Sequence, residues 1–187
     1  MSGYLSEEQL AELNFGKLGK NVRISVTSMI YNCQNIEIGD NVRIDNFCTI
    51  APSGGARLRI GDYVHISAYN FMNGMKDITL GDFSTTAPFV AIFSSTDDYS
   101  GQSLTGGVVP RALIGTFSGE VRIGKHVIIG TNSTIMPGIT LAEGTAVGAH
   151  SFVKTGTDAF DIVAGVPARK IGQRDRRLLT LEKQINE

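Results

Sequence analysis

Three side chains in this sequence are candidates for acid–base chemistry: His65, Asp97 and Asp98. A neutral imidazole accepts a proton near pH 7, and a neighbouring carboxylate stabilises the imidazolium that forms. A carboxylate could instead bind an amine, which loses its proton far more readily than an alcohol and therefore needs a weaker base. Each side chain also has an inert interpretation, with His65 as an exposed corner residue and the aspartates as the start of an Asx turn.

A repeat of six residues must position these groups. An aliphatic residue recurs at every sixth position from Ile123 to Val153 and is often followed by glycine. This period fits neither an amphipathic helix nor a plain strand, so it predicts a solenoid in which each hexapeptide forms one flat side. The register also runs backwards through the chain, and only Met72 and Thr86 are not Leu, Ile or Val. The positions in this register are Leu18, Ile24, Ile30, Ile38, Ile44, Ile50, Ile60, Ile66, Met72, Leu80, Thr86, Ile92, Ile123, Ile129, Ile135, Leu141, Val147 and Val153.

Three hexapeptides make one triangular coil of about 18 residues. Extra residues enter after Ile30, Ile50 and Met72, where a coil would turn. The fold class is therefore all-β, a parallel β-helix of about six coils that rises roughly 30 Å at about 4.8 Å per coil. Each aliphatic layer buries the next, so no single coil is expected to be stable alone.

A long insertion interrupts this register between Ile92 and Ile123, where about two dozen residues exceed what the coil needs. The insertion, residues 94–120, contains Asp97 and Asp98 together with apolar residues such as Tyr99 and Leu113. A long loop with enough apolar surface to pack is typical of a functional segment.

The two ends are predicted to be caps on a single domain of 187 residues. Ser6 and Gln9 have the spacing of a capping box, which predicts a short helix within an N-terminal cap of residues 1–17. The coils cover 18–93 and 121–171, and a charged helix from Arg174 to Asn186 fills the C-terminal segment, 172–187. Both helices are expected to shield strand edges that would otherwise invite aggregation.

Composition excludes several functional classes. The net charge is −1, and 42% hydrophobic with 19% charged residues is ordinary for a globular protein. Because there is no basic run, nucleic acid is not an expected partner. No apolar stretch is long enough to span a membrane, and no signal peptide is visible, so a cytoplasmic location is expected. Cys33 and Cys48 are predicted to be free thiols.

The repeated pattern of Leu, Ile or Val followed by Gly, over residues 18 to 170, resembles the left-handed β-helix of the hexapeptide-repeat acyltransferases. The segment from Ile123 to Ile171 is similar to the C-terminal part of galactoside and maltose acetyltransferases, with the runs 136–138 (Met-Pro-Gly) and 164–169 (Ala-Gly-Val-Pro-Ala-Arg). The resemblance supplies the left-handed sense. It also implies a homotrimer that binds acetyl-CoA as co-substrate in a groove between adjacent β-helices.

The resemblance assigns cofactor contacts by matching position. It implies that Thr131 and Ala149 line the path of the pantetheine arm. Lys154 and Thr155 stand where the family has a Thr-Lys pair, in swapped order. Arg169 matches an arginine near the nucleotide, and Lys170 would add a phosphate contact.

The family's usual loop histidine, which deprotonates a hydroxyl acceptor, is missing from this sequence. One interpretation makes His65 the base, with Asp97 or Asp98 orienting it. These residues fall at different corners of the coil, so they could meet only across a trimer interface or through folding of the loop. The other makes Asp97 or Asp98 the group that binds an amine acceptor, which would explain the missing histidine.

Two further histidines, His126 and His150, occupy the third position after a ladder residue, where side chains are expected to point outward. The three histidines contain no close pair with metal-ligand spacing, so no metal is expected.

These observations predict an acetyl-CoA-dependent acetyltransferase that modifies an amino or hydroxyl group of a sugar. The sugar is expected to be nucleotide-linked or destined for a surface polysaccharide. The alternative is a β-helix that has lost its base and serves only as an assembly or scaffold protein.

Overall fold

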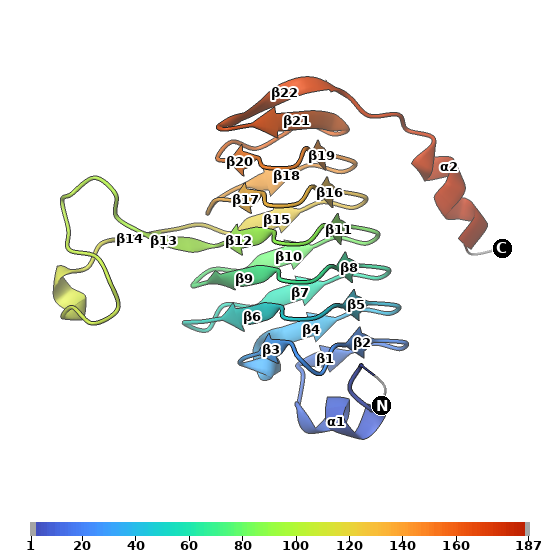
Figure 1. Ribbon diagram of the computed structural model, residues 1–187, viewed down its shortest axis with the longest axis horizontal. Helices are drawn as coiled ribbons and strands as arrows, with labels where there is room; N and C mark the ends of the chain where they lie inside the picture. The colour runs from blue at the N-terminus through green and yellow to red at the C-terminus, as the bar shows by residue number, and fades with distance from the viewer. Residues whose placement is uncertain (1–2, 186–187) are drawn as a thin grey trace.

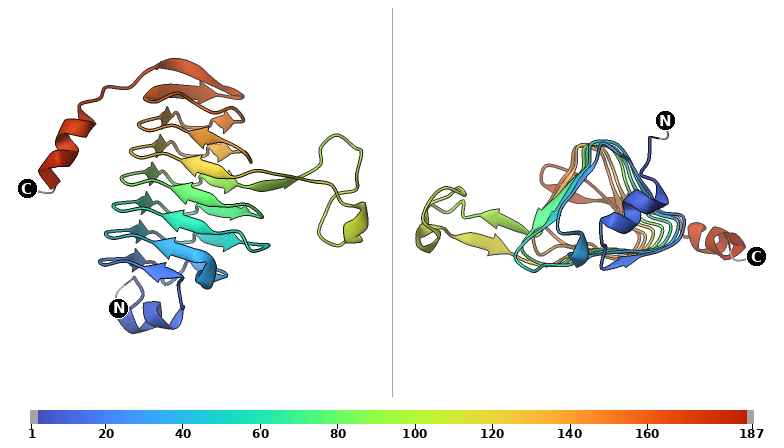
Figure 2. Two further views of the ribbon diagram at one scale, coloured as in Figure 1. Left: turned by 180° about the vertical axis from the view of Figure 1, so that it is seen from behind. Right: turned by 90° about the horizontal axis from the view of Figure 1, so that it is seen from below.

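A computed structural model describes residues 3–185, which form a three-sided solenoid with a loop projecting from one side (Figure 1). Each coil contributes one short strand to each of three parallel sheets. Seen from below, the coils superimpose as a triangle, with the loop and the C-terminal helix extending in opposite directions (Figure 2).

The strand order within each sheet follows the chain coil by coil. Sheet 1 contains β1 (Lys17–Leu18), β4 (Ile36–Ile38), β7 (Leu58–Ile60), β10 (Ile78–Leu80), β15 (Val121–Ile123) and β18 (Thr140–Leu141). Sheet 2 contains β2 (Arg23–Ile24), β5 (Arg43–Ile44), β8 (His65–Ile66), β11 (Thr85–Thr86), β16 (Ile128–Ile129), β19 (Ala146–Val147), β21 (Asp161–Gly165) and β22 (Ala168–Gln173). Sheet 3 contains β3 (Met29–Ile30), β6 (Thr49–Pro52), β9 (Phe71–Gly74), β12 (Ala91–Phe93), β17 (Thr134–Ile135) and β20 (Phe152–Val153).

The aliphatic repeat forms the core. Ile66, Ile92 and Ile129 are 0% exposed, and equivalent residues of adjacent coils are register partners in the sheets. Leu18, in the first coil, is 37% exposed because a terminal coil has a neighbour on one side only. Cys33 and Cys48 are buried and free, so the prediction of free thiols is confirmed.

Aromatic side chains stack along two corners of the triangle. Their ring centroids lie 4.8–5.1 Å apart, because equivalent corner residues of consecutive coils are separated by one strand spacing. The corner between sheets 2 and 3 carries one stack, and the corner between sheets 1 and 2 carries the other. The stacks are Phe47, Tyr69 and Phe89, and Tyr63, Phe83 and His126.

The N-terminal cap forms as predicted. Helix α1 (Glu7–Glu12) begins with a capping box in which Ser6 and Gln9 exchange hydrogen bonds, and Leu10 is buried against the first coil. A short 3-10 helix, η1 (Cys33–Asn35), fills the first corner insertion.

The C-terminal cap differs from the prediction. The antiparallel hairpin β21–β22 closes the last coil, whereas α2 (Leu178–Glu182) is shorter than the predicted helix and lies beside the solenoid instead of over its end (Figure 1). A 3-10 helix, η3 (Lys183–Ile185), follows, and Asn186 lies outside the described residues. A pairing hairpin satisfies the backbone groups of the sheet edge directly, which a helix cannot do.

The inserted loop begins as a two-stranded antiparallel ribbon of β13 (Ser95–Asp97) and β14 (Thr116–Ser118). Beyond the ribbon it contains the 3-10 helix η2 (Arg111–Leu113) and projects well away from the coils (Figure 1). Its base therefore lies beside sheet 3, at the end of β12.

Thr86 is the one polar residue in the aliphatic ladder, and its hydroxyl has no hydrogen-bond partner among the described residues although it is 1% exposed. We expect Thr86→Val to raise the free energy of unfolding by about 1–2 kcal/mol, because valine has the same shape and removes a buried, unpaired hydroxyl. Denaturant unfolding would measure this change. The matched control is Thr85→Val on the outer face, expected to change stability by less than about 0.5 kcal/mol. A destabilised Thr86→Val variant would contradict the prediction.

Candidate active site

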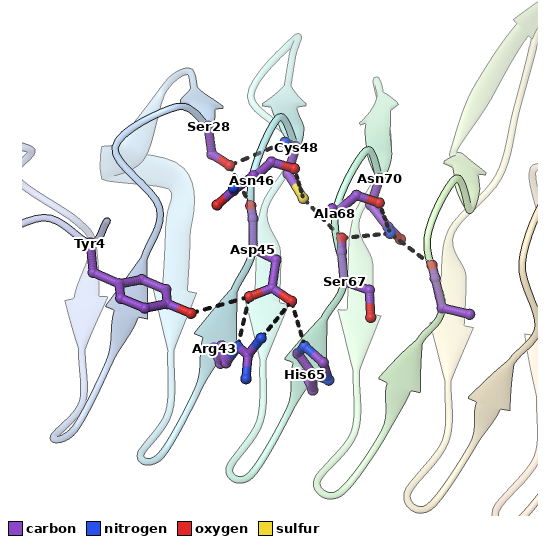
Figure 3. A network of polar contacts seen from close by, with 11 residues as sticks. Tyr4, Ser28, Arg43, Asp45, Asn46, Cys48, His65, Ser67, Ala68 and Asn70 are labelled. Atoms are coloured by element: carbon purple, nitrogen blue, oxygen red, sulfur yellow. Dashed lines mark hydrogen bonds and ion pairs between the residues drawn. The ribbon is translucent and has the colours of Figure 1, made fainter. Parts of the chain in front are cut away.

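His65 is paired with a carboxylate that the sequence had not indicated. Its Nε2 atom lies 2.9 Å from Oδ2 of Asp45, which precedes it by 20 residues, one full coil (Figure 3). The histidine side chain is 36% exposed and that of Asp45 16%. Within one chain neither Asp97 nor Asp98 comes near His65, because the loop projects from sheet 3 while His65 lies on sheet 2. That an aspartate of the loop orients His65 across a trimer interface stays a prediction.

Asp45 is held by three side chains, one of which is His65. The Arg43 guanidinium donates to both carboxylate oxygens, at 2.6 and 3.0 Å, and the Tyr4 hydroxyl donates to Oδ1 at 3.4 Å. Burial acts to raise the pKa of Asp45, but hydrogen bonds and charge from Arg43 and His65 outweigh it, so the pKa is lowered. Asp45 is therefore an anion at neutral pH. The spacing of one coil is the sequence signal that could have identified Asp45 as a neighbour of His65. Arg43 is the register partner of His65, and Asp45 lies two residues after Arg43.

Asp97 lies at the mouth of a cavity of about 750 Å³ between the ribbon and the outer face of sheet 3. Its Oδ2 atom accepts a hydrogen bond from the Gly106 amide at 3.2 Å, and its side chain is otherwise exposed. The cavity is apolar toward the upper coils and polar toward the ribbon. Its walls are Asn73, Met75, Phe93, Ser95, Thr96, Tyr99, Thr116, Thr134, Met136 and Phe152.

Asp98 stabilises a turn in the inserted loop. Its Oδ1 atom accepts a hydrogen bond from the Ser100 amide at 2.7 Å, the geometry of an Asx turn, and contacts with Ser100 and Ser103 lower its pKa. Asp98 does not line the cavity beside Asp97. The geometry thus favours Asp97 over Asp98 as a group that meets a ligand.

Thr131 and Ala149 lie in adjacent coils at the corner between sheets 2 and 3. The Thr131 hydroxyl donates to the Pro88 carbonyl at 2.7 Å, and Ala149 is exposed. Each follows a glycine that cannot carry a side chain, because a Cβ on Gly130 would lie 2.5 Å from the Ala149 nitrogen. The corner therefore presents mainly backbone, which suits a ligand that lies along the solenoid.

The remaining predicted cofactor residues lie near the C-terminal end of the solenoid. Thr155, Arg169 and Lys170 share a depression of about 230 Å³ at the closing hairpin. Lys170 already forms an ion pair with buried Asp161, at 2.6 Å. Lys154 is exposed directly after β20, on the same sheet as the cavity beside Asp97.

The prediction that His126 is a surface residue is wrong. The C-terminal segment covers it: its Nε2 atom lies 2.8 Å from Oε2 of Glu182 in α2, its ring stacks on Phe83, and it is 8% exposed. Lys125 also pairs with Glu182 and helps to lower the pKa of that carboxyl. His150 is exposed, as predicted.

Within residues 3–185 there is no cluster of three or more His, Cys, Asp or Glu that could hold a metal. The same residues contain no helix long and apolar enough to cross a membrane.

A family model described as "bacterial transferase hexapeptide (six repeats)" matches residues 120–155. The dTDP-4-amino-4,6-dideoxy-D-glucose acyltransferase of Escherichia coli is 44% identical over 179 residues, which cover 96% of this chain and 93% of the relative. The chain belongs to the hexapeptide-repeat acyltransferases. The predicted sugar acyltransferase is thereby confirmed, and the non-catalytic scaffold loses its support.

Solved structures of this acyltransferase family agree with the fold. AntD, an N-acyltransferase from Bacillus cereus solved in complex with dTDP and 3-hydroxybutyryl-CoA, is 40% identical with a TM-score of 0.94, covering 100% of this chain and 97% of AntD. A maltose O-acetyltransferase from Clostridium difficile is 24% identical with a TM-score of 0.58, covering 91% of this chain and 75% of that one, and shows the fold alone. The predicted left-handed parallel β-helix is confirmed for this acyltransferase.

Proposed function

We propose that this acyltransferase moves the acyl group of an acyl-CoA to the 4-amino group of dTDP-4-amino-4,6-dideoxyglucose. The observation that carries the proposal is the exposed carboxylate of Asp97 at a cavity of about 750 Å³, in a loop without histidine. A carboxylate suits an amine, whose attack creates positive charge on nitrogen. The names of the E. coli relative and of AntD support an amino-sugar acceptor.

The reaction needs no covalent enzyme intermediate. The amine lone pair attacks the thioester carbonyl, the C–N bond forms, and the carbonyl electrons move onto oxygen. Collapse of this intermediate breaks the C–S bond and releases the thiolate of coenzyme A. The proton lost by nitrogen passes to an enzyme base and then to the thiolate, so charge and atoms balance.

In this proposal two side chains have separate roles. Asp97 binds the amino group and stabilises its developing positive charge, while His65 accepts the proton. Because they lie on different sheets of one chain, they meet only if the loop of one subunit reaches the sheet 2 face of another. A cyclic homotrimer satisfies this requirement, since a head-to-tail contact closes into a ring. Exposed apolar loop residues such as Tyr99, Val108 and Leu113 give that contact an apolar surface.

For the donor, we propose acetyl-CoA with its nucleotide at the upper end of the solenoid. Arg169 and Lys170 would contact phosphate, Lys154 and Thr155 would flank the pantetheine arm, and Thr131 and Ala149 would line its path. The backbone-rich corner described above supports this route. Acetyl is the acyl group that the family resemblance implies, and AntD in complex with 3-hydroxybutyryl-CoA makes the longer acyl group a necessary comparison.

Thiol release in the presence of purified protein tests the proposal. With acetyl-CoA or 3-hydroxybutyryl-CoA as donor, dTDP-4-amino-4,6-dideoxyglucose is expected to have a kcat/KM at least about a hundredfold above dTDP-6-deoxyglucose, which carries a hydroxyl at C4. Coenzyme A should also raise the melting temperature, since it binds the folded state. Absence of thiol release with both donors, or preference for the hydroxyl sugar, would overturn the proposal.

A further inference from the structure

One edge of sheet 2 forms a continuous row along the solenoid axis. Each of its residues directly follows the inward-facing residue of a strand, and backbone hydrogen bonds tie each to the next coil. We call this the edge row. From the lowest coil to the highest, it consists of Ser25, Asp45, Ser67, Ala87, Gly130, Gly148 and Ala164.

The edge row changes character along its length. Its upper members are small, and the predicted pantetheine residues Thr131 and Ala149 directly follow Gly130 and Gly148. Its two lowest members are Ser25, which is buried, and Asp45, which carries a carboxylate. A donor whose nucleotide lies at the closing hairpin therefore extends downward along the small residues, with its thioester end directed toward Asp45.

His65 lies next to this lower end. It precedes Ser67 of the edge row by two residues. A separation of one strand and two residues places the Cα atoms of His65 and Ala87 about 8 Å apart, within reach of an imidazole side chain and a bound thioester. Figure 3 shows Asp45 on the side of His65 that faces the N-terminal coils.

The contact with Asp45 fixes how the imidazole is protonated. An ionised carboxylate only accepts hydrogen bonds, so Nε2 must carry a proton to donate to Asp45. In the neutral ring Nδ1 is then the acceptor, and no hydrogen bond to Nδ1 is present within residues 3–185. Arg43 and Tyr4 fill the other acceptor sites of Asp45, which prevents the carboxylate from rotating away.

We propose that Asp45 is a positioning residue that, held by Arg43 and Tyr4, presents Nδ1 of His65 as the proton acceptor of the acyl transfer. This inference rests on the proposed function. The proton leaves the acceptor amine for Nδ1, gives an imidazolium paired with Asp45, and then moves to the departing thiolate of coenzyme A. Asp45 itself gains and loses no proton.

The charged groups facing His65 are few. Arg43 lies in β5, Asp45 directly follows that strand, and Tyr4 comes from the N-terminal segment. On the other side the register partner is Thr85 of β11, which does not titrate. The imidazolium is therefore stabilised mainly by Asp45. Removing the carboxylate charge must make the base harder to protonate.

The test compares Asp45→Asn with the native enzyme, with dTDP-4-amino-4,6-dideoxyglucose and the better donor as substrates. Asparagine has the size of aspartate and keeps one acceptor oxygen, so the fold should persist. We expect kcat to fall about 10- to 100-fold with both KM values within about twofold. The acidic limb of the kcat–pH profile should move to lower pH, a change that a merely structural role would not produce.

Two further variants make the result decisive. His65→Gln should lower kcat at least as far as Asp45→Asn, and the double variant should be no slower than His65→Gln alone, because Asp45 acts only through His65. The matched control is Asp77→Asn, another carboxylate with a lowered pKa beside an arginine, Arg59 at 3.1 Å. It should leave kcat and the pH profile unchanged.

Separate results distinguish this inference from the proposed function. A native enzyme without activity on the amino sugar contradicts the proposed function. An active native enzyme whose Asp45→Asn variant keeps the native pH profile overturns the positioning role of Asp45, as does an additive double variant.

Discussion

Replacement of Asp97 by alanine is expected to lower kcat for amine acylation by roughly 10²- to 10³-fold. The carboxylate lies at the mouth of the cavity beside β13, where it would balance the positive charge that develops on the attacking nitrogen. Its loss leaves that charge without a partner and removes an orienting hydrogen bond from the acceptor. Steady-state kinetics with the amino sugar would measure the effect, and KM for the acyl-CoA should change little.

The adjacent aspartate provides the control. Asp98→Asn keeps an acceptor for the Ser100 amide and does not alter the cavity, so its kcat should stay within about threefold of native. A variant lacking Asp97 that retains more than a tenth of native kcat would exclude this carboxylate from the acceptor site. If Asp98→Asn is the slower variant, the assignment of the two aspartates must be reversed.

Truncation of a central ladder residue should have the largest effect on stability. Ile129 is 0% exposed and is the register partner of Thr86 below and Val147 above. We expect Ile129→Ala to lower the free energy of unfolding by about 3–4 kcal/mol, because neighbouring coils held by backbone hydrogen bonds cannot collapse into the cavity. At roughly 2–4 °C per kcal/mol for a chain of this length, the melting temperature should fall by about 10 °C.

The preceding residue is a matched control with the same side chain. Ile128 lies on the same strand but on the outer face, where it is 41% exposed. Ile128→Ala should therefore cost less than about 1 kcal/mol. Equal losses from the two variants would mean that the coil stack does not depend on its inner ladder.

Sequence periodicity predicted the architecture because a coil depends on one inward aliphatic residue per side. Ile66 and Ile92 could be assigned to the core by counting, without any tertiary information. The capping box at Ser6 was equally readable, since its hydrogen bonds are local. Positions that obey local rules were predicted correctly.

Contacts between coils and between distant segments were harder to predict. The contact between Asp45 and His65 was not predicted, because it depends on the register between strands of neighbouring coils and not on a local motif. His126 was misplaced because the chain returns 56 residues later to cover it with Glu182, and no periodic signal encodes that return. The closing hairpin was missed for a similar reason, since β22 pairs backwards and breaks the parallel pattern.

The inserted ribbon leaves the solenoid and returns to it at nearly the same point. The Gly119 amide donates to the Ser94 carbonyl at 3.0 Å, and Ser94 is itself buried and bonded to Lys76. The coil after the insertion therefore packs on the coil before it as it would if the inserted residues were absent. Such a side branch can be lengthened, shortened or exchanged at small entropic cost to the scaffold. A change in the length or sequence of this insertion can therefore reshape the walls of the cavity beside Asp97 while the stack of coils keeps its structure.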